Sequence, residues 1–253
     1  MNLTPMLAIL RREVYRILRV WSQTIIPPIV TSTLYILIFG FSLGSRITDI
    51  AGVTYLEFIV PGLLMMGVIM SAYMNTATSL FIAKWSKMLQ EWLVAPISYW
   101  QIIMALTLAA MFRALIVGLG ILVVSLTFTP ITIQNYFVLI YFVVMSSLLF
   151  AFAGIATGLW ATNFDKMNVF STFLITPLIY LGGVFYSIHM LPEFWANLAR
   201  FNPILYMVDG FRYAFIGVSD VPVIYSVVLV FSLTLAFFVL CLHLFRIGYR
   251  LRT

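Results

Sequence analysis

The 253-residue sequence is poor in charged side chains and in side chains that bind metals. Only 9% of its residues are Asp, Glu, Lys or Arg, and it has one cysteine and two histidines. One cysteine excludes an intrachain disulfide framework, and no His-Glu-x-x-His pair or cysteine cluster is present to hold a metal. A glycine-rich phosphate loop ending in Gly-Lys-Ser or Gly-Lys-Thr is also missing. We therefore expect no metal, ATP or other cofactor to be bound by this chain.

What the sequence has instead is hydrophobic length, because 63% of its residues are hydrophobic. A helix rises about 1.5 Å per residue, so about 20 apolar residues cross the hydrocarbon layer of a bilayer. Six stretches pass this test, at 24–44, 58–81, 101–127, 135–161, 168–186 and 223–245. Backbone amides in lipid must be paired within the protein, which favours helices here. The prediction is an all-α polytopic membrane protein, with 1–253 forming a single transmembrane domain.

The basic residues predict how this domain is oriented, because Lys and Arg in short loops are retained on the cytoplasmic side. Ten of them fall on one side of the predicted spans: Arg11, Arg12, Arg16, Arg19, Lys84, Lys87, Lys166, Arg246, Arg250 and Arg252. The other side has Arg46, Arg200 and Arg212. Both termini are therefore predicted to be cytoplasmic. The net charge of +6 suits an anionic lipid surface and requires no nucleic acid.

Residues 1–23 are predicted to form an amphipathic helix on the membrane surface. One face carries apolar residues and ends at Trp21, whereas Arg12, Arg16 and Arg19 lie nearly opposite, which suits contact with lipid phosphates. Pro27 and Pro28 predict a break where the chain enters the membrane. The alternative is a plain cytoplasmic extension of the first span.

The loop at 82–100 is predicted to contain a short cytoplasmic helix. Trp85 belongs to an apolar stripe, and Lys84, Lys87 and Glu91 form a charged stripe at spacings of three and four residues. Pro96 limits the helix. Such a helix would offer a charged ridge to a cytoplasmic partner, or would serve only as an amphipathic connector.

The outer segment 187–222 is too apolar for an ordinary aqueous loop and too short for two full crossings. A re-entrant hairpin of two short helices broken at Asn202-Pro203 fits its length. Asp209 and Arg212 are three residues apart, so we expect them to pair on one helical face. The hairpin would cap a translocation path, or would be only a structural aromatic belt.

Three other features bear on a path through the membrane. Arg113 lies inside a span, where an arginine is costly, so it faces a path, meets carbonyls or a partner such as Glu57, or snorkels to the inner surface. Pro177 and the pair Gly182-Gly183 would allow a bend in the predicted fifth span.

The sequence resembles the type-two ATP-binding-cassette exporter permeases, and the likeness runs along the whole chain. Glu91, Leu93 and Pro96 in QEWLVAPIS match the pattern of the family's coupling helix. FIVPGLLMM resembles the start of its second span and LITPLIYLGGVFYS its fifth span, and NPILYMVDGFRYAFIG resembles the Asn-Pro and Asp-Gly-x-Arg motif before its sixth. The Arg and Gly that often precede the acidic coupling residue are absent.

The resemblance implies a bacterial inner-membrane permease that pairs with a second copy of itself. Two copies of a separate P-loop ATPase would dock on its cytoplasmic side and bind ATP and Mg²⁺. The surface helix and the coupling helix would transmit the ATP-driven closure. The expected cargo is an amphipathic, drug-like, lipid-linked or saccharide compound moved outward, with membrane lipids as further partners.

Other functional classes need residues that this sequence lacks. An ion-coupled secondary transporter usually has carboxylates at the centre of its spans and repeated halves, and neither is evident. An intramembrane enzyme needs a nucleophile or metal constellation. The alternatives left open are an ion-coupled transporter and a permease that works in the uptake direction.

Overall fold

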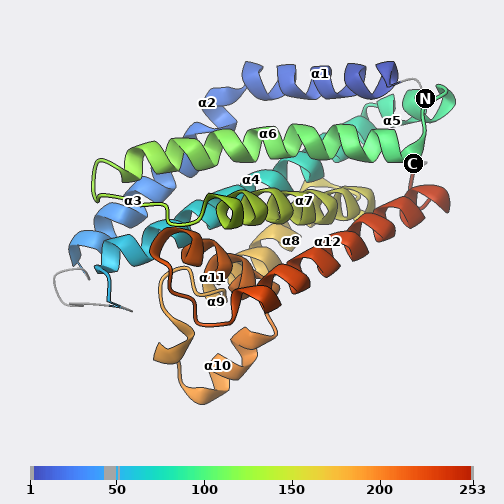
Figure 1. Cartoon of the computed structure of the whole chain (residues 1–253). Helices are drawn as coiled ribbons and strands as arrows, with labels where there is room; N and C mark the ends of the chain where they lie inside the picture. The colour runs from blue at the N-terminus through green and yellow to red at the C-terminus, as the bar shows by residue number, and fades with distance from the viewer. Residues whose placement is uncertain (1–2, 43–49, 51, 252–253) are drawn as a thin grey trace.

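The computed structural model describes residues 3–42, 50 and 52–251, although the side chains of Phe41 and Ser42 are not described. Within these ranges the secondary structure is helical and includes no strand. The long helices lie side by side in one bundle (Figure 1). They are α3 (Ile26–Ser42), α4 (Tyr55–Trp85), α6 (Tyr99–Ser125), α7 (Tyr136–Trp160) and α12 (Val223–Arg246). The shorter elements are α1 (Thr4–Arg19), α2 (Trp21–Thr24), α5 (Met88–Val94), α8 (Phe164–Phe170), η1 (Ser171–Ile175), α9 (Thr176–Leu181), η2 (Ile188–Met190), α10 (Glu193–Arg200) and α11 (Pro203–Ile216).

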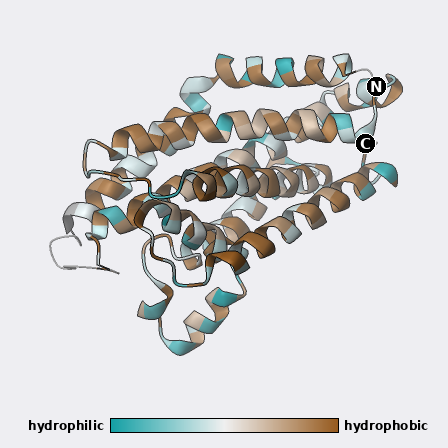
Figure 2. Cartoon of the chain, viewed as in Figure 1, coloured by the Kyte–Doolittle hydropathy of each residue, from teal (hydrophilic) through white to brown (hydrophobic). Residues whose placement is uncertain are grey.

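Five helical segments in the described residues are long and apolar enough to cross a membrane, not six. They are Trp21–Gly40, Tyr55–Trp85, Tyr99–Ser125, Tyr136–Trp160 and Val223–Arg246. The predicted span at 168–186 is divided instead among α8, the π-helical turn η1 and α9. The end of the predicted first span, at 43–44, lies outside the described residues. Apolar residues make up most of the length of the long helices (Figure 2), and many large apolar side chains on them are exposed, as expected for surfaces that face lipid.

Helix α4 is the centre of the bundle. Its N-terminus is fixed by a capping box, in which Thr54 and Glu57 bind each other's backbone N–H groups. Most of its length is buried, and it packs closely along α7. A Cβ atom at Gly154 would collide with Thr76, and one at Gly158 would lie 2.9 Å from the carbonyl oxygen of Ala77. The glycine spacing in α7 thus allows two backbones of this chain to approach closely.

Helices α7 and α12 run in the same direction. The Tyr141 hydroxyl near the start of α7 donates to the carbonyl of Val227 near the start of α12, at 2.7 Å. At the other end, Arg250 follows α12 and donates to the carbonyl of Trp160, the last residue of α7. The chain between two such parallel helices must return to the starting side, and α8, η1 and α9 make this return. We call residues 164–183 the return segment.

The broken helix ends at the glycine pair. Gly182 follows the last residue of α9, and Gly183 has φ 76°, in the left-handed region that glycine adopts readily. The prediction that these glycines bend a continuous helix is therefore wrong, because they terminate it. Pro177 lies in the first turn of α9, directly after the π-helical turn, so the irregular part of this helix is next to the proline.

The structure moves the boundaries of two other predicted features. The break predicted at Pro27 and Pro28 lies just before them, at Ile25, and both prolines occupy the first turn of α3, where proline is tolerated. The loop at 82–100 contains the predicted short helix, α5, but this helix does not include Lys84 and Trp85. Helix α4 continues to Trp85, Lys87 has φ 61°, and α5 then begins in a new direction at Met88.

Candidate functional site

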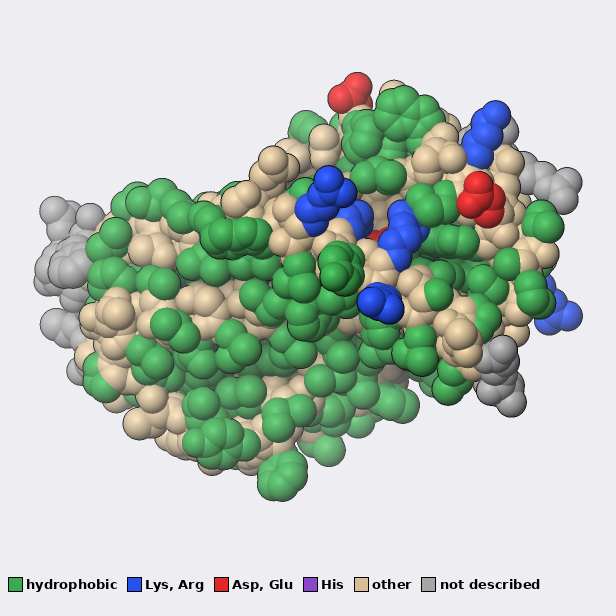
Figure 3. Space-filling model, turned by 90° about the horizontal axis from the view of Figure 1, so that it is seen from above, with side chains coloured by type: hydrophobic (Ala, Val, Ile, Leu, Met, Phe, Trp, Pro, Cys, Tyr) green, Lys and Arg blue, Asp and Glu red, His purple; other side chains and the backbone are tan. Residues whose placement is uncertain are grey.

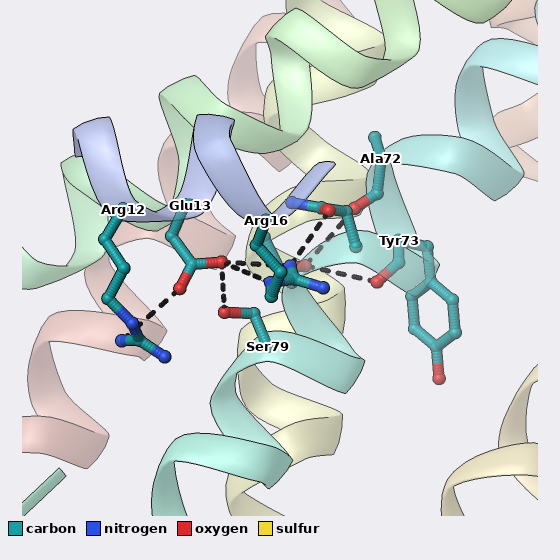
Figure 4. A network of polar contacts seen from close by, with 8 residues as sticks. Arg12, Glu13, Arg16, Ala72, Tyr73 and Ser79 are labelled. Carbon is teal, nitrogen blue, oxygen red and sulfur yellow. Dashed lines mark hydrogen bonds and ion pairs between the residues drawn. The ribbon is translucent and has the colours of Figure 1, made fainter. Parts of the chain in front are cut away.

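A buried carboxylate joins α1 to α4 near the end of the bundle that carries both chain termini (Figures 1 and 4). Glu13 has 0% exposure. Its Oε2 atom accepts hydrogen bonds from Arg16 Nε at 3.1 Å, Arg16 Nη2 at 2.9 Å and Ser79 Oγ at 2.6 Å. Arg16 also donates to Asn75 of α4, and Arg12 Nη1 lies 3.5 Å from Glu13 Oε1. We call Arg12, Glu13, Arg16, Asn75 and Ser79 the inner polar cluster.

The inner polar cluster changes the interpretation of α1. Arg12 and Arg16 turn toward Glu13 and the bundle, so the prediction that both lie on the far side among lipid phosphates is wrong (Figure 4). Arg19 and Trp21 are exposed, and their role in anchoring to the membrane surface stays a prediction. Sequence reasoning missed Glu13, although an acidic residue three positions before Arg16 and among four arginines was a signal.

Arg12 extends the inner polar cluster to α5. Its guanidinium lies over the Trp92 ring, 5.3 Å from the centroid, a distance at which a cation and an aromatic face attract. Trp92 and Leu89 are the buried residues of α5. Since the cluster also holds Ser79 of α4, one group of side chains connects α1, α4 and α5.

Helix α5 leaves a set of side chains uncovered. Trp85, at the end of α4, is 71% exposed and Val94 is 88% exposed. Lys87, Glu91 and Pro96 are exposed as well, while Leu93 is partly buried. Basic side chains on the face seen in Figure 3 gather toward the half of the molecule that carries the chain ends. The exposed side of α5 is therefore available to a partner.

Lys84 does not belong to that exposed set. It lies in the last turn of α4, is 4% exposed, and its Nζ donates to the carbonyls of Leu159 at 2.8 Å and Ala161 at 2.9 Å. Arg250 donates to the carbonyl between them, that of Trp160. Two cations thus satisfy three successive carbonyls at the C-terminal end of α7, where the helix dipole favours positive charge. The predicted charged ridge loses this member.

Arg113 is held by a carbonyl on a neighbouring element. Its Nη2 donates to the carbonyl of Thr24 at 2.9 Å. In a continuous helix this carbonyl would accept from the residue four positions later, which is Pro28 and has no N–H. Arg113 therefore satisfies an acceptor that the proline leaves free. Glu57 is not its partner, because that carboxylate caps the start of α4.

At the opposite end of the bundle, α11 fastens the return segment. Asn202 caps α11 by accepting from Ile204 N–H at 3.0 Å, and its Nδ2 donates to the carbonyl of Leu178 at 2.6 Å. Pro203 occupies the first position of α11, where proline is favoured. One side chain thus joins the start of α11 to α9.

Asp209 and Arg212 make separate contacts, so the predicted direct ion pair is wrong. Asp209 accepts from the backbone N–H groups of Asp220 at 2.8 Å and Val221 at 3.0 Å. Arg212 donates to the carbonyl of Gly183 at 2.6 Å, and its guanidinium lies 3.8 Å from the centroid of the Phe58 ring. Both side chains are buried. They hold the loop before α12 and the end of the return segment in place.

The structure therefore brings together Gly183 and Arg212, and brings Asn202 and Pro203 to the end of α9 near Pro177. It does not bring Arg113 to this group, since its partner is Thr24. Asp220 was missed by sequence reasoning: its carboxylate accepts from Ser187 Oγ at 2.8 Å and from Ile188 N–H at 3.0 Å. No short motif marks it, because the contact spans a long loop.

The model of the family described as "ABC-2 type transporter" matches residues 4–216. This chain belongs to that family. The permease is 43% identical over 242 residues to the "Inner membrane transport permease YadH" of Escherichia coli K12, which covers 96% of this chain and 94% of that protein. It is 25% identical over 190 residues to "Nodulation protein J" of Rhizobium leguminosarum bv. trifolii, covering 73% and 71% of the two chains.

Membership confirms the resemblance drawn from the sequence and makes this chain a multi-pass permease subunit rather than an enzyme. Transporters of this family work with an ATP-binding subunit. The described residues form one helical bundle, in which one side of α5 is exposed.

Proposed function

We propose that this chain is the membrane subunit of an ATP-binding-cassette exporter in the bacterial inner membrane. Two copies would form the path, and two copies of a separate ATPase, which binds ATP and Mg²⁺, would drive it. The observation that carries the proposal is the arrangement of α5, a short helix that is anchored by Leu89 and Trp92 and uncovered on its other side.

The return segment α8–η1–α9 acts as a sixth crossing in this proposal. Support comes from the distance between the two α4 residues that contact the ends of this segment. Lys84 contacts Ala161 before the segment, and Gly62 adjoins Val184 after it. At about 1.5 Å per residue, these two α4 positions are about 33 Å apart, close to the thickness of a hydrocarbon layer. The segment covers this distance with a broken helix, which is why its length and composition differ from those of the other spans.

Six crossings put both chain termini on the same side, and the positive residues favour the cytoplasm. Helix α5 then lies on the cytoplasmic side, and α10 and α11 lie toward the outside as a re-entrant hairpin. Asn202, Asp209 and Arg212 would set the position of that hairpin over the path rather than contact cargo, because their polar atoms are engaged within the protein.

The proposed mechanism begins when ATP binding draws the ATPase subunits together and displaces α5. Arg12 on Trp92 and Glu13 on Ser79 would pass this displacement to α1 and α4 as one unit. Helix α4 contacts α3, α6, α7 and α11, so its movement alters the packing on which the path depends. The cargo would be an amphipathic, drug-like, lipid-linked or saccharide compound, consistent with a relative whose name links it to nodulation.

Docking through α5 is tested by Glu91→Arg, which reverses a charge on the uncovered side. We expect the ATPase encoded with this permease to co-purify with the unaltered chain and to be lost with the variant. Glu193→Arg at the far end of the molecule is the matched control and should retain it. Unchanged co-purification and unchanged ATP-driven transport with Glu91→Arg would remove this residue from the docking surface.

Export is tested in inside-out vesicles, whose cytoplasmic face is on the outside. Export would then accumulate cargo inside the vesicles when ATP is added, whereas ATP-dependent movement of cargo out to the cytoplasmic side would assign uptake instead. Uphill transport by the purified chain alone with only an ion gradient would favour a secondary transporter.

A further inference from the structure

A lateral slot opens between α12 and the return segment, with α7 as its floor. Its volume is about 420 Å³. Leu149, Ala153 and Ala156 line the floor, Phe237 and Leu240 line one wall, and Leu174 lines the other. The Thr157 hydroxyl, which also lines the slot, donates to the carbonyl of Ala153 in its own helix at 2.9 Å and so offers no free donor. The interior is suited to hydrocarbon.

The slot has the length of one membrane leaflet. Its floor extends from Leu149 to Trp160 along α7, which corresponds to about 16 Å of helix. This is about half of the roughly 30 Å hydrocarbon layer. The slot also ends where α7 ends, at the side of the bundle that carries α5. A single acyl chain lying parallel to the helices fits this geometry, whereas a crossing peptide would need twice the length.

The end of the slot at Trp160 is aromatic and then basic. Trp160 is 40% exposed and its ring centroid lies 6.2 Å from that of Phe170 on the opposite wall. Arg250 donates one N–H to the carbonyl of Trp160 and is otherwise exposed. Lys166 is exposed and lies four residues before Phe170, so both are on the same side of α8. Asp165, the residue before Lys166, points about 100° away around the helix. An aromatic pair followed by two cations matches the region where acyl chains meet headgroups.

We propose that this slot binds one acyl chain of an anionic phospholipid, whose phosphate lies near Lys166 and Arg250. The apolar interior and leaflet length select a lipid chain, and the two cations select a negative headgroup over a zwitterionic one. The bound chain occupies the gap between α12 and the return segment, so it supports the broken helix on the side that faces α12. The site does not depend on the direction or cargo of transport.

The first experiment counts the lipid that remains on the purified permease by native mass spectrometry, after exchange into phosphatidylglycerol or phosphatidylcholine. We expect the unaltered chain to retain one phosphatidylglycerol and to prefer it over phosphatidylcholine by about five-fold for each cation. Ala153→Phe with Ala156→Phe fills the slot and should lose this lipid. Leu235→Phe, on an exposed part of α12 outside the slot, is the matched control and should keep it.

The second experiment requires no change to the slot walls. The permease is placed in vesicles that contain both lipids in fixed amounts, with bromine carried on the chains of either one. The contribution of Trp160 is the difference in emission between the unaltered chain and Trp160→Phe. Brominated phosphatidylglycerol should quench it more strongly, and Lys166→Gln should reduce that excess about five-fold.

Equal quenching by the two brominated lipids would overturn the proposal, because the slot would then contact only bulk lipid. No quenching by either would also overturn it, since a second copy would then cover the slot. Retention of phosphatidylglycerol by a folded Ala153→Phe, Ala156→Phe variant would place the lipid elsewhere.

Discussion

Glu13→Gln tests whether the inner polar cluster holds α1 against the bundle. The substitution preserves the shape of the side chain and removes the charge that Arg16 and Ser79 contact. Hydrogen bonds to charged groups contribute about 1.5–3 kcal/mol each. Removing one partner of a fully buried ion pair costs about 3–5 kcal/mol.

We expect the loss of stability to be smaller than that for a fully buried ion pair. The Arg16 side chain keeps 24% exposure, so water takes over part of its solvation, and glutamine still offers one acceptor oxygen. We expect a loss of about 1.5–3 kcal/mol. For a chain of this size, that corresponds to a fall in melting temperature of about 3–12 °C.

Cys241 provides the assay. It is the single cysteine of the chain and has 0% exposure, so a thiol-reactive fluorescent dye reports unfolding in detergent. Glu193→Gln, at an exposed position, is the matched control and should change the stability by less than about 0.5 kcal/mol. Ser79→Ala should add less in the Glu13→Gln background than alone, because both act on one network. If Glu13→Gln had the same melting temperature as Glu193→Gln, the inner polar cluster would not hold α1.

Three further predictions concern other contacts and use the same melting assay. Lys84→Met should lower stability by about 1.5–3 kcal/mol by leaving the carbonyls of Leu159 and Ala161 without their charged donor, whereas Lys87→Met should have little effect; equal losses would refute the helix-end role. Gly154→Leu should destabilise by about 1–3 kcal/mol or more by forcing α4 and α7 apart, and a wild-type melting temperature would mean that the two helices are less closely packed than described. Asn202→Ala should lower stability by about 1–2 kcal/mol through loss of the α11 cap, while Asn202→Ser, which keeps a small accepting oxygen at this position, should lose less; the reverse order would contradict the capping geometry.

The site residues were harder to predict than the helices. Leu93 and Pro96 are identified by a local pattern, and their docking role stays a prediction. Lys84 shares the spacing of Lys87 and Glu91, yet it binds the end of α7 because α4 continues further than the pattern indicates. The spacing of Asp209 and Arg212 permits a pair, but stronger partners lie on distant segments.

The sequence by itself determined the long helices, because hydrophobic length and backbone pairing are local requirements. The predicted span at 223–245 and the observed Val223–Arg246 nearly coincide. Tertiary structure decided which polar group meets which partner and where the fifth predicted span breaks. Glu13 is buried because Ser79 of α4 donates to it. Arg113 satisfies the carbonyl left free by Pro28 because α6 packs beside α2 and α3. The return segment ends at Gly183, whose carbonyl accepts from Arg212 of α11. Those contacts join residues far apart in the chain, and no local pattern encodes them.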